Sequence, residues 1–427
     1  MKVDKYKRVL VVSHNCFSKT GSNGRTLMNY LVGWDKEKIA QLYIHSEQPD
    51  FSVCERFFCV TDSAVMRSIL KRRPAGRIVK DIPAEIIEEL KGNSAAEPKK
   101  VRKNSLMALI REAAWMSPLW NAKRLNSWID EFNPQVILFQ AGDGAFLFRL
   151  VRRLAEKRNI PVIIYNTEGY YFKKKSYFPE KSLTKLFYPV LHRLFCREYK
   201  KLIKVTKHSI YNCDLLCEDY NRAFNKNDFV IMNTSEFTDE EVFEEKENRF
   251  IYAGNLGLLR HKGLIEFAEA LKKVDSRAVL EVYGKAPTDK VINDLEECEA
   301  IEYRGLIPYE ELKEKLKRCR FLVHTESFNE FFKEDLKYAF STKVADSLAS
   351  GGCLLVYAPE NMAVSQYIKE TRAGVLIPEK EELEKTLSEL LNNEERVKEI
   401  SCSGRALALE NHNILKNREK FQQLIIE

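Results

Sequence analysis

The chain contains 427 residues, of which 44% are hydrophobic, and it carries a formal net charge of +7. This length predicts two or three domains, and this hydrophobic share excludes a chain that is largely disordered. No apolar run approaches the roughly 18 residues of a membrane span, and the apolar run near the N-terminus is too short for a signal-peptide core, so we expect a cytoplasmic protein.

The positive charge is concentrated in the first half of the chain. Residues 1–230 contain 41 Lys and Arg against 24 Asp and Glu, whereas the remainder has an acidic excess. Basic regions of this size suit nucleic acid or an anionic membrane surface. The sequence has no RNP, helix-turn-helix or zinc-finger pattern, so we expect no nucleic-acid partner and favour a membrane. The alternative is that the basic runs are only solvated faces.

Short apolar runs alternate with helical patterns through the first half. We expect strands at residues 8–14, 39–45, 57–60, 134–140 and 160–165. This alternation predicts a parallel, doubly wound α/β sheet whose ligands lie at the carboxyl ends of the strands. The loop of residues 18–26 joins the first strand to a helix and contains Gly24 and Arg25. Loops of this kind either contact ligands or serve only tight packing.

Residues 166–169 follow a predicted strand and should therefore point into a cleft. Glu168 is the ionisable residue of this segment. Its carboxylate is suited to act as an acid or base, or to bind an acceptor hydroxyl. The alternative is that it caps the segment that follows.

Two further regions combine basic and aromatic residues. Basic runs at residues 67–73 and 99–103 precede helices that contain Trp115, Trp120 and Trp128. Residues 170–195 interleave aromatic side chains with lysines, among them Lys173, Lys174 and Lys175. Aromatic bodies at an acyl boundary and cations at lipid headgroups are the parts of an interfacial membrane anchor. The alternatives are stacking on nucleic acid and an ordinary aromatic core.

The second half follows an acidic, polar stretch at residues 238–248, which we interpret as a linker. A short helix at residues 341–352 offers an anion site, because free backbone N–H groups, the helix dipole and the Lys343 ammonium converge at its start. Ser341 is a good N-cap, and Asp346, one turn later, can reach a sugar hydroxyl. The alternative is an ordinary capped helix. Further strands are expected at residues 249–253, 279–284, 301–305, 321–325 and 353–357.

These features resemble the GT-B glycosyltransferases, specifically the large retaining family known as family 4. Asp346 through Gly351 corresponds to that family's Glu-Ala-x-Ala-x-Gly pattern, in which the acidic residue binds the nucleotide ribose. Lys262 and Gly263 match the Lys-Gly of its diphosphate-binding block. Gly284 and Gly305 end strands that match family strands whose ends touch the donor.

The resemblance implies an α/β, GT-B fold of two doubly wound, Rossmann-like domains facing a cleft. Residues 1–240 are then the acceptor-binding domain, and residues 241–410 are the domain that binds a nucleotide-sugar donor. A helix at residues 411–427 is expected to cross back to the first domain.

The resemblance also implies a set of site residues. Asn255 takes the position of the family's clamp arginine, for which Arg260 can substitute. Tyr338 takes the position of a sugar-binding glutamate, which leaves Glu326, Glu330 or no residue for that role. The predicted catalytic residues are Glu168, Arg260 and Lys262. The predicted donor-binding residues are Gly24, Arg25, Gly254, Asn255, Lys262, Gly284, Arg304, Ser341, Thr342, Lys343 and Asp346.

The function implied is transfer of a sugar from a nucleotide-sugar donor to a glycan or lipid-linked glycan, with retention and without a metal or cofactor. Cell-surface polysaccharide or glycoconjugate synthesis at the inner face of the membrane is the expected setting. The alternatives are a nucleotide-sugar epimerase of the same fold and a non-catalytic subunit that resembles a glycosyltransferase and binds a partner enzyme.

Overall fold

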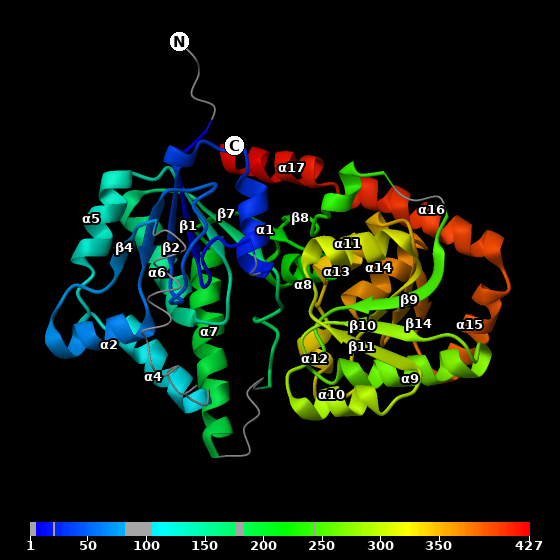
Figure 1. The fold of residues 1–427 in the computed structure, drawn as a ribbon. Helices are drawn as coiled ribbons and strands as arrows, with labels where there is room; N and C mark the ends of the chain where they lie inside the picture. Colours follow the sequence, from blue (N-terminus) through cyan, green and yellow to red (C-terminus); the bar gives the residue numbers. More distant parts are fainter. Residues whose placement is uncertain (1–5, 20–21, 82–103, 176–182, 242–244) are drawn as a thin grey trace, which may run out of the picture. The chain divides into compact units, whose positions relative to one another are not determined.

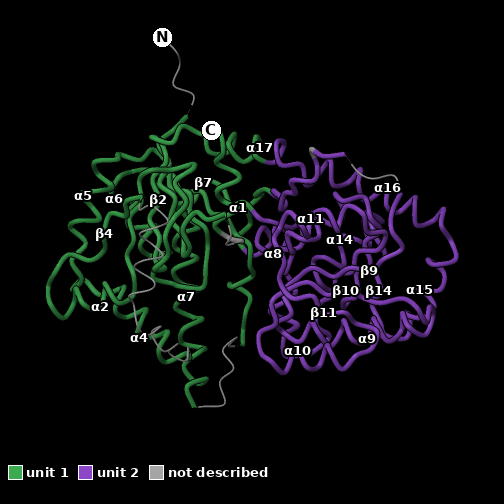
Figure 2. The backbone as a smooth tube through the Cα atoms, in the orientation of Figure 1, with its two compact units in different colours: residues 1–210, 224–229, 418–427 green, residues 211–223, 230–417 purple. Residues whose placement is uncertain are grey.

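The computed structural model describes residues 6–19, 22–81, 104–175, 183–241 and 245–427. The chain forms two compact units, which Figure 2 shows in green and purple. Unit 1 comprises residues 1–210, 224–229 and 418–427, and unit 2 comprises residues 211–223 and 230–417. Each unit is built around its own sheet, so the predicted α/β class is confirmed.

The sheet of unit 1 has the order β4-β3-β2-β1-β5-β6-β7-β8 in the described part of the chain (Figure 1). The strands β1, β2, β3, β5 and β6 pair in parallel, and the short edge strand β4, which the sequence pattern did not predict, is antiparallel to β3. Every residue of β1 is buried, which explains its continuous apolar sequence. The strands are β1 (Val9–Ser13), β2 (Ile39–Tyr43), β3 (Arg56–Cys59), β4 (Arg77–Val79), β5 (Val136–Gln140), β6 (Val162–Asn166), β7 (Thr206–Tyr211) and β8 (Phe229–Val230).

Helices follow most strands of this sheet. They are α1 (Ser22–Leu31), α2 (Asp62–Lys71), α4 (Ser105–Met116), α5 (Lys123–Phe132), α6 (Ala145–Arg158), α7 (Tyr188–Ile203) and α8 (Asp214–Phe224), with the short 3-10 helices η1 (Lys36–Lys38) and η2 (Leu183–Phe187). The strand order reverses at β1, whose neighbours are β2 and β5. Loops on either side of such a reversal run to opposite faces of the sheet, which leaves room for a ligand at the carboxyl ends of these strands.

The sheet of unit 2 has the order β11-β10-β9-β12-β13-β14, and its paired strands are parallel. Here the reversal lies between β9 and β12. The strands are β9 (Glu247–Ala253), β10 (Leu280–Tyr283), β11 (Ile301–Gly305), β12 (Cys319–Thr325), β13 (Cys353–Tyr357) and β14 (Val375–Ile377). The helices are η3 (Glu236–Asp239), α9 (Arg260–Val274), α10 (Asp289–Glu296), α11 (Tyr309–Arg318), α12 (Lys333–Leu336), α13 (Thr342–Ala349), α14 (Ala363–Thr371), η4 (Lys380–Glu382), α15 (Leu383–Leu391), α16 (Glu394–Asn411) and α17 (Ile414–Ile426).

The division of the chain differs from the predicted boundary at residue 240, because the chain joins unit 2 from residue 211 and returns briefly to unit 1 at 224–229. Helix α8 is held in unit 2 by Asp219, whose carboxylate accepts hydrogen bonds from Lys337 Nζ and Tyr338 OH, both at 2.6 Å. Asn233 Nδ2 likewise donates to the Phe340 carbonyl oxygen at 2.8 Å. These contacts join segments more than 100 residues apart, so composition along the chain does not reveal them.

The end of α17 belongs to unit 1 from residue 418 onward. The Phe421 ring stacks on the Tyr30 ring of α1 with centroids 4.4 Å apart. Arg418 Nε donates to the Asn29 carbonyl oxygen at 2.8 Å. The helix predicted at residues 411–427 therefore has its last ten residues in unit 1.

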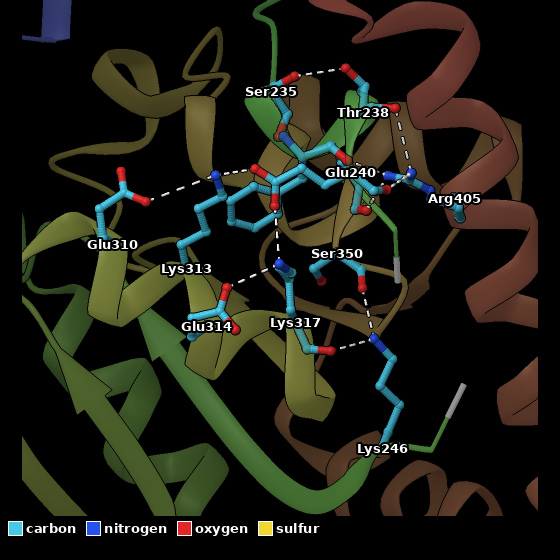
Figure 3. A network of polar contacts seen from close by, with 12 residues as sticks. Ser235, Thr238, Glu240, Lys246, Glu310, Lys313, Glu314, Lys317, Ser350 and Arg405 are labelled. Atoms are coloured by element: carbon cyan, nitrogen blue, oxygen red, sulfur yellow. Dashed lines mark hydrogen bonds and ion pairs between the residues drawn. The ribbon is translucent and has the colours of Figure 1, made fainter. Parts of the chain in front are cut away.

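The acidic stretch interpreted as a linker is bound tightly within unit 2 in its described part (Figure 3). The Arg405 guanidinium of α16 donates to four backbone carbonyl oxygens, those of Phe237, Thr238, Glu240 and Ala349, at 2.5–3.5 Å. The Glu240 carboxylate pairs with two lysines of α11, Lys313 and Lys317.

Lys246 completes this network. Its ammonium donates to the carbonyl oxygens of Lys317 and Ser350 at 2.5 and 2.8 Å, at the ends of α11 and α13. A cation at a helix carboxyl end offsets the negative end of the dipole. Burial lowers the pKa of Lys246 to about 8. The segment that enters unit 2 is thus fixed by charged groups rather than left as a tether.

Arg405→Met should destabilise unit 2, because methionine keeps the length of the side chain but donates no hydrogen bond. Loss of these charge-assisted bonds should cost about 2–3 kcal/mol, which corresponds to a fall of about 5–10 °C in the thermal unfolding midpoint. Circular dichroism measures the midpoint. Arg277→Met, at an exposed position of the same unit, is the matched control. Equal midpoints for the two variants would contradict the structural role of Arg405.

Candidate functional site

An ion pair lies at the strand reversal of unit 2. Arg260 is the first residue of α9, after β9, and Glu326 directly follows β12. Arg260 Nε donates to Glu326 Oε2 at 2.7 Å, and His324 Nε2 lies 3.3 Å from Glu326 Oε1. Burial alone raises the pKa of Glu326, but the hydrogen bond from His324 and the charge of Arg260 outweigh it, so the pKa lies below its usual value. Glu326 is therefore a buried carboxylate that holds Arg260 in place.

Glu330, the other candidate for the missing glutamate, lies elsewhere. It is exposed and pairs with Lys333 at 3.1 Å. Of the two glutamates considered from the sequence, the structure brings only Glu326 to the strand reversal.

Lys343 lies beside this pair. Helix α13 begins as predicted, with Ser341 as N-cap and its Oγ accepting a hydrogen bond from Lys343 N. The Lys343 side chain is half-buried, and burial lowers its pKa; Asp346 opposes this effect, and the positive charge of Arg260 adds to it. Lys343 thus interacts electrostatically with Arg260 and Asp346, which are also predicted site residues. A bound anion would stabilise both cations, at a helix start that already favours negative charge.

Asp346 is oriented by the segment that Arg405 holds. Ser235 Oγ donates to Asp346 Oδ1 at 2.7 Å, and Ser235 also caps η3 by accepting a hydrogen bond from Phe237 N. Thr238 in turn donates to the Ser235 carbonyl oxygen (Figure 3). The Asp346 carboxylate, which is predicted to bind a ribose, therefore already accepts a hydrogen bond from the protein.

Three predicted glycines lie at the ends of three neighbouring strands, starting with β9, the strand that precedes Arg260. Gly254, Gly284 and Gly305 end or follow β9, β10 and β11, and Gly284 N donates to the Gly305 carbonyl oxygen at 2.9 Å. A Cβ atom at Gly284 would lie 2.0 Å from the Gly254 carbonyl oxygen. Glycine is thus required at residue 284 by the close packing of the strand ends, where Tyr303 OH also donates to the Gly284 carbonyl oxygen at 2.9 Å.

Four other predicted donor ligands have different surroundings. The Asn255 side chain accepts a hydrogen bond from Gly257 N at 2.8 Å and so shapes the loop before α9, in which Leu258 and Leu259 have φ of 57° and 62°. Lys262 is exposed in the first turn of α9. Arg304 is exposed on β11 and pairs with Glu302 at 2.6 Å. Thr342 is half-buried in the first turn of α13.

Gly24 and Arg25 lie in unit 1, within α1 rather than in the loop that the sequence predicted. A Cβ atom at Gly24 would lie 2.2 Å from the Cys16 carbonyl oxygen. The glycine therefore allows α1 to pack against the chain that follows β1. The packing alternative accounts for its presence.

A cavity of about 960 Å³ opens in unit 1 at the carboxyl ends of β1, β5 and β6. Polar residues at its sheet end include His14, Gln140, Asp143 and Glu168. Glu168, predicted to point into a cleft, does line this cavity, and its carboxylate lies 3.8 Å from Lys173 Nζ.

Three ionisable groups of the cavity were missed from the sequence. His14 Nε2 lies 3.5 Å from Asp143 Oδ1, and burial lowers the pKa of His14 to about 4 although Asp143 opposes this. Glu112 accepts hydrogen bonds from Ala145 N and Phe146 N at the start of α6, and burial raises its pKa to about 8. The available signal was that His14 ends a predicted strand and Asp143 lies three residues after another; Glu112 lies in mid-helix and gave none.

The predicted membrane anchor is largely part of the core. Trp115 and Trp128 are buried, and Trp120 packs against Trp115 with ring centroids 5.6 Å apart. Lys173 is only 9% exposed and lies 4.9 Å from the Tyr170 ring centroid. Lys174 and Lys175 are exposed. The basic run at 99–103 and the aromatic residues 177 and 178 lie outside the described residues.

Exposed apolar side chains occur instead on η2 and the start of α7. Leu183 and Leu186 are 82% and 71% exposed, and Phe187 and Val190 are also exposed. Their spacing places them along one side of a helical path. We call these four residues the η2–α7 stripe. Among the described residues, no helix combines the length and apolarity needed to cross a membrane.

Comparison with known proteins supports the predicted resemblance. A family model described as glycosyl transferase-like matches residues 260–423, which include α9, α13 and the charged residues Arg260, Glu326, Lys343 and Asp346. Comparison with curated proteins gives no match.

Solved structures match nearly the whole chain. HepE from Anabaena in complex with UDP has 9% sequence identity and a TM-score of 0.64, covering 98% of this chain and 99% of HepE. Sucrose-phosphate synthase from Thermosynechococcus elongatus has 12% identity and a TM-score of 0.62, with 98% of both chains covered. WaaG, a glycosyltransferase involved in lipopolysaccharide biosynthesis, has 12% identity and a TM-score of 0.53, covering 98% of this chain and 99% of WaaG. The chain therefore has the GT-B fold of the glycosyltransferases, and its residues 260–423 match a glycosyl transferase-like family.

Proposed function

We propose that the protein is a glycosyltransferase that moves a sugar from a nucleotide-sugar donor to an acceptor. The observation that carries this proposal is the proximity of Lys343 to Arg260 at the strand reversal of unit 2, each in the first turn of a helix. Arg260 already pairs with Glu326, and Asp346 offsets part of the charge at Lys343, but a diphosphate at these two helix starts would meet both cations and the positive ends of both helix dipoles. The similar structures of HepE contain UDP and UDP-glucose, which are anions of the required kind.

The chemistry follows from where negative charge develops. As the bond between the sugar and the diphosphate breaks, the leaving phosphate gains charge, and fixed cations stabilise that state more than the ground state. Lys343 and Arg260 supply those cations, with Lys262 as a further contact, and Asp346 binds a ribose hydroxyl. Ser341 and Thr342 frame the phosphate, whereas Gly254, Gly284 and Gly305 let the nucleotide approach the backbone. This arrangement requires no metal or cofactor.

The acceptor binds in the cavity of unit 1. Glu168, at the sheet end of this cavity, is the group proposed to bind or deprotonate an acceptor hydroxyl. The acceptor is a glycan or a lipid-linked glycan, in polysaccharide or glycoconjugate synthesis. Retention at the anomeric carbon is expected from the resemblance to family 4, and NMR of the first-formed product tests it.

Lys343→Ala should weaken UDP binding at least tenfold, because a charge-assisted contact to a buried phosphate contributes about 1.5–3 kcal/mol. Lys262→Ala should also weaken binding, but less, because Lys262 is exposed. Titration calorimetry with UDP measures both. Lys385→Ala, at an exposed position on α15, is the matched control and should bind UDP normally.

An unchanged affinity of Lys343→Ala for UDP would contradict the proposed contact between Lys343 and the phosphate. Activity is then assayed with a panel of nucleotide sugars, with products identified by mass spectrometry. Donor binding without transfer or hydrolysis would favour the non-catalytic subunit, and conversion of the donor to another sugar nucleotide would favour the epimerase.

We also propose that unit 1 binds an anionic membrane surface through the η2–α7 stripe. The stripe is accompanied by exposed cations at Lys174, Lys175 and Lys185. Apolar side chains that enter the acyl boundary and lysines that meet headgroups together give reversible adhesion. The stripe lies within residues 170–195, the segment predicted as an anchor, but it uses only exposed side chains of that segment, because Trp115, Trp128 and Lys173 pack inward.

The variant Lys174/Lys175/Lys185→Glu should lose sedimentation with anionic liposomes. Each lysine near such a surface contributes about 1 kcal/mol, and this contribution decreases as salt screens it. The wild type should sediment at low salt and stay in the supernatant at high salt or with neutral liposomes. Lys290/Lys385/Lys398→Glu, three exposed lysines of unit 2, is the control for net charge. If the wild-type protein stays in the supernatant with anionic liposomes at low salt, the proposed membrane binding by the stripe is wrong.

A further inference from the structure

The cavity of unit 1 is polar at one end. His14, Gln140 and Asp143 come from the carboxyl ends of β1 and β5, where the strand order reverses. They offer hydrogen-bond donors and acceptors to a hydroxylated group, and Glu168 adds a carboxylate at the end of β6. A sugar or similar head group fits this end.

The walls away from the sheet are mainly apolar. Helix α7 contributes Tyr188, Leu191 and Phe195, which recur at helical spacing on one face. Helix α4 contributes Met107 and Ile110 from the facing side, with Trp115 deeper in the cavity. A ligand made only of sugar could stack on the aromatic side chains but would leave the aliphatic Met107, Ile110 and Leu191 without a complementary apolar surface, because their favourable burial requires apolar area on the ligand.

The apolar wall continues to the protein surface. Met107 and Ile110 line the cavity and are each 45% exposed, so they belong both to the cavity wall and to the protein surface. Helix α4 also packs against η2 and α7, the elements that carry the η2–α7 stripe. Met107 and Ile110 therefore offer an apolar chain a path from a surface beside the stripe into the cavity, alongside the polar Asn104, Arg111 and His192 that also line it.

We propose that this cavity binds an amphiphilic acceptor, with its hydroxylated head at His14 and Asp143 and its hydrocarbon chain along Met107, Ile110 and Leu191. The acceptor class is thus a lipid-linked one, supplied from an anionic membrane surface that the neighbouring lysines match in charge. This inference rests on the proposed glycosyltransferase function and narrows its acceptor.

The test uses n-dodecyl β-D-maltoside, below its critical micelle concentration, as the amphiphile and maltose as the matching sugar without a chain. Calorimetry with the full chain should show the maltoside binding at least tenfold more tightly than maltose. Met107→Glu and Ile110→Glu should each reduce maltoside affinity at least tenfold, because a carboxylate would interrupt the apolar wall.

Two control variants locate the binding. Leu119→Glu introduces the same charge at a leucine that is 68% exposed and outside the cavity lining, and it should not change maltoside affinity. Leu186→Glu alters the η2–α7 stripe but not the lining, and it should leave binding below the critical micelle concentration intact. Loss of binding with Leu186→Glu and not with Ile110→Glu would place the detergent on the surface and overturn the proposal.

Equal affinity for maltose and the maltoside would also overturn it. Titration of the same preparations with UDP separates this result from failure of the proposed function. Normal UDP binding without amphiphile binding rejects only the lipid-linked acceptor. Amphiphile binding without binding of UDP, GDP, ADP or dTDP rejects the transferase and leaves a lipid-binding unit.

Discussion

Both candidate sites depend on one constraint, the reversal of strand order beside the first strand of each parallel sheet. Loops that leave the sheet toward opposite faces cannot fill the space at the carboxyl ends of these strands. In unit 2 that space receives Arg260 and Glu326, and in unit 1 it receives His14 and Asp143. The two units share this architecture but place different chemistry in it, which is the basis of the proposed division between a charged donor and an acceptor of different polarity.

The electrostatics of the two sites differ for a physical reason. In unit 2 the buried carboxylate of Glu326 has two basic partners, so it stays ionised and fixes a guanidinium beside a second cation. In unit 1 the balance is the reverse, because burial, with the charge of Arg111, dominates over the carboxylates of Asp143 and Asp62, and the imidazole of His14 remains neutral at neutral pH. This difference agrees with the proposal that the site of unit 2 binds phosphate, whereas the partly apolar cavity of unit 1 binds hydroxyls and hydrocarbon.

The network around Arg405 connects the fold to the donor site. It holds the segment that carries Ser235, and Ser235 orients Asp346 on α13. The same α13 carries Lys343 in its first turn, and Lys246 binds the carbonyl oxygen that follows its last turn. Interactions at both ends of this short helix therefore position the residues proposed to contact the nucleotide, and stability and binding are coupled through it.

The sequence by itself determined the α/β class, most of the strands and the capped start of α13, because apolar periodicity and capping are local properties. The resemblance to the glycosyltransferases, and no local pattern, added Arg260 to Lys343 and Asp346 as predicted site residues, and their roles stay predictions. The sequence also indicated Glu168, which follows a strand. Only the tertiary structure decided that Glu326 rather than Glu330 meets Arg260, and that Lys173 and Trp115 are buried while Leu186 is exposed. Residues 211–223 join unit 2 for the same reason. These outcomes depend on contacts between distant segments, and no local pattern specifies which face of a helix another segment will cover.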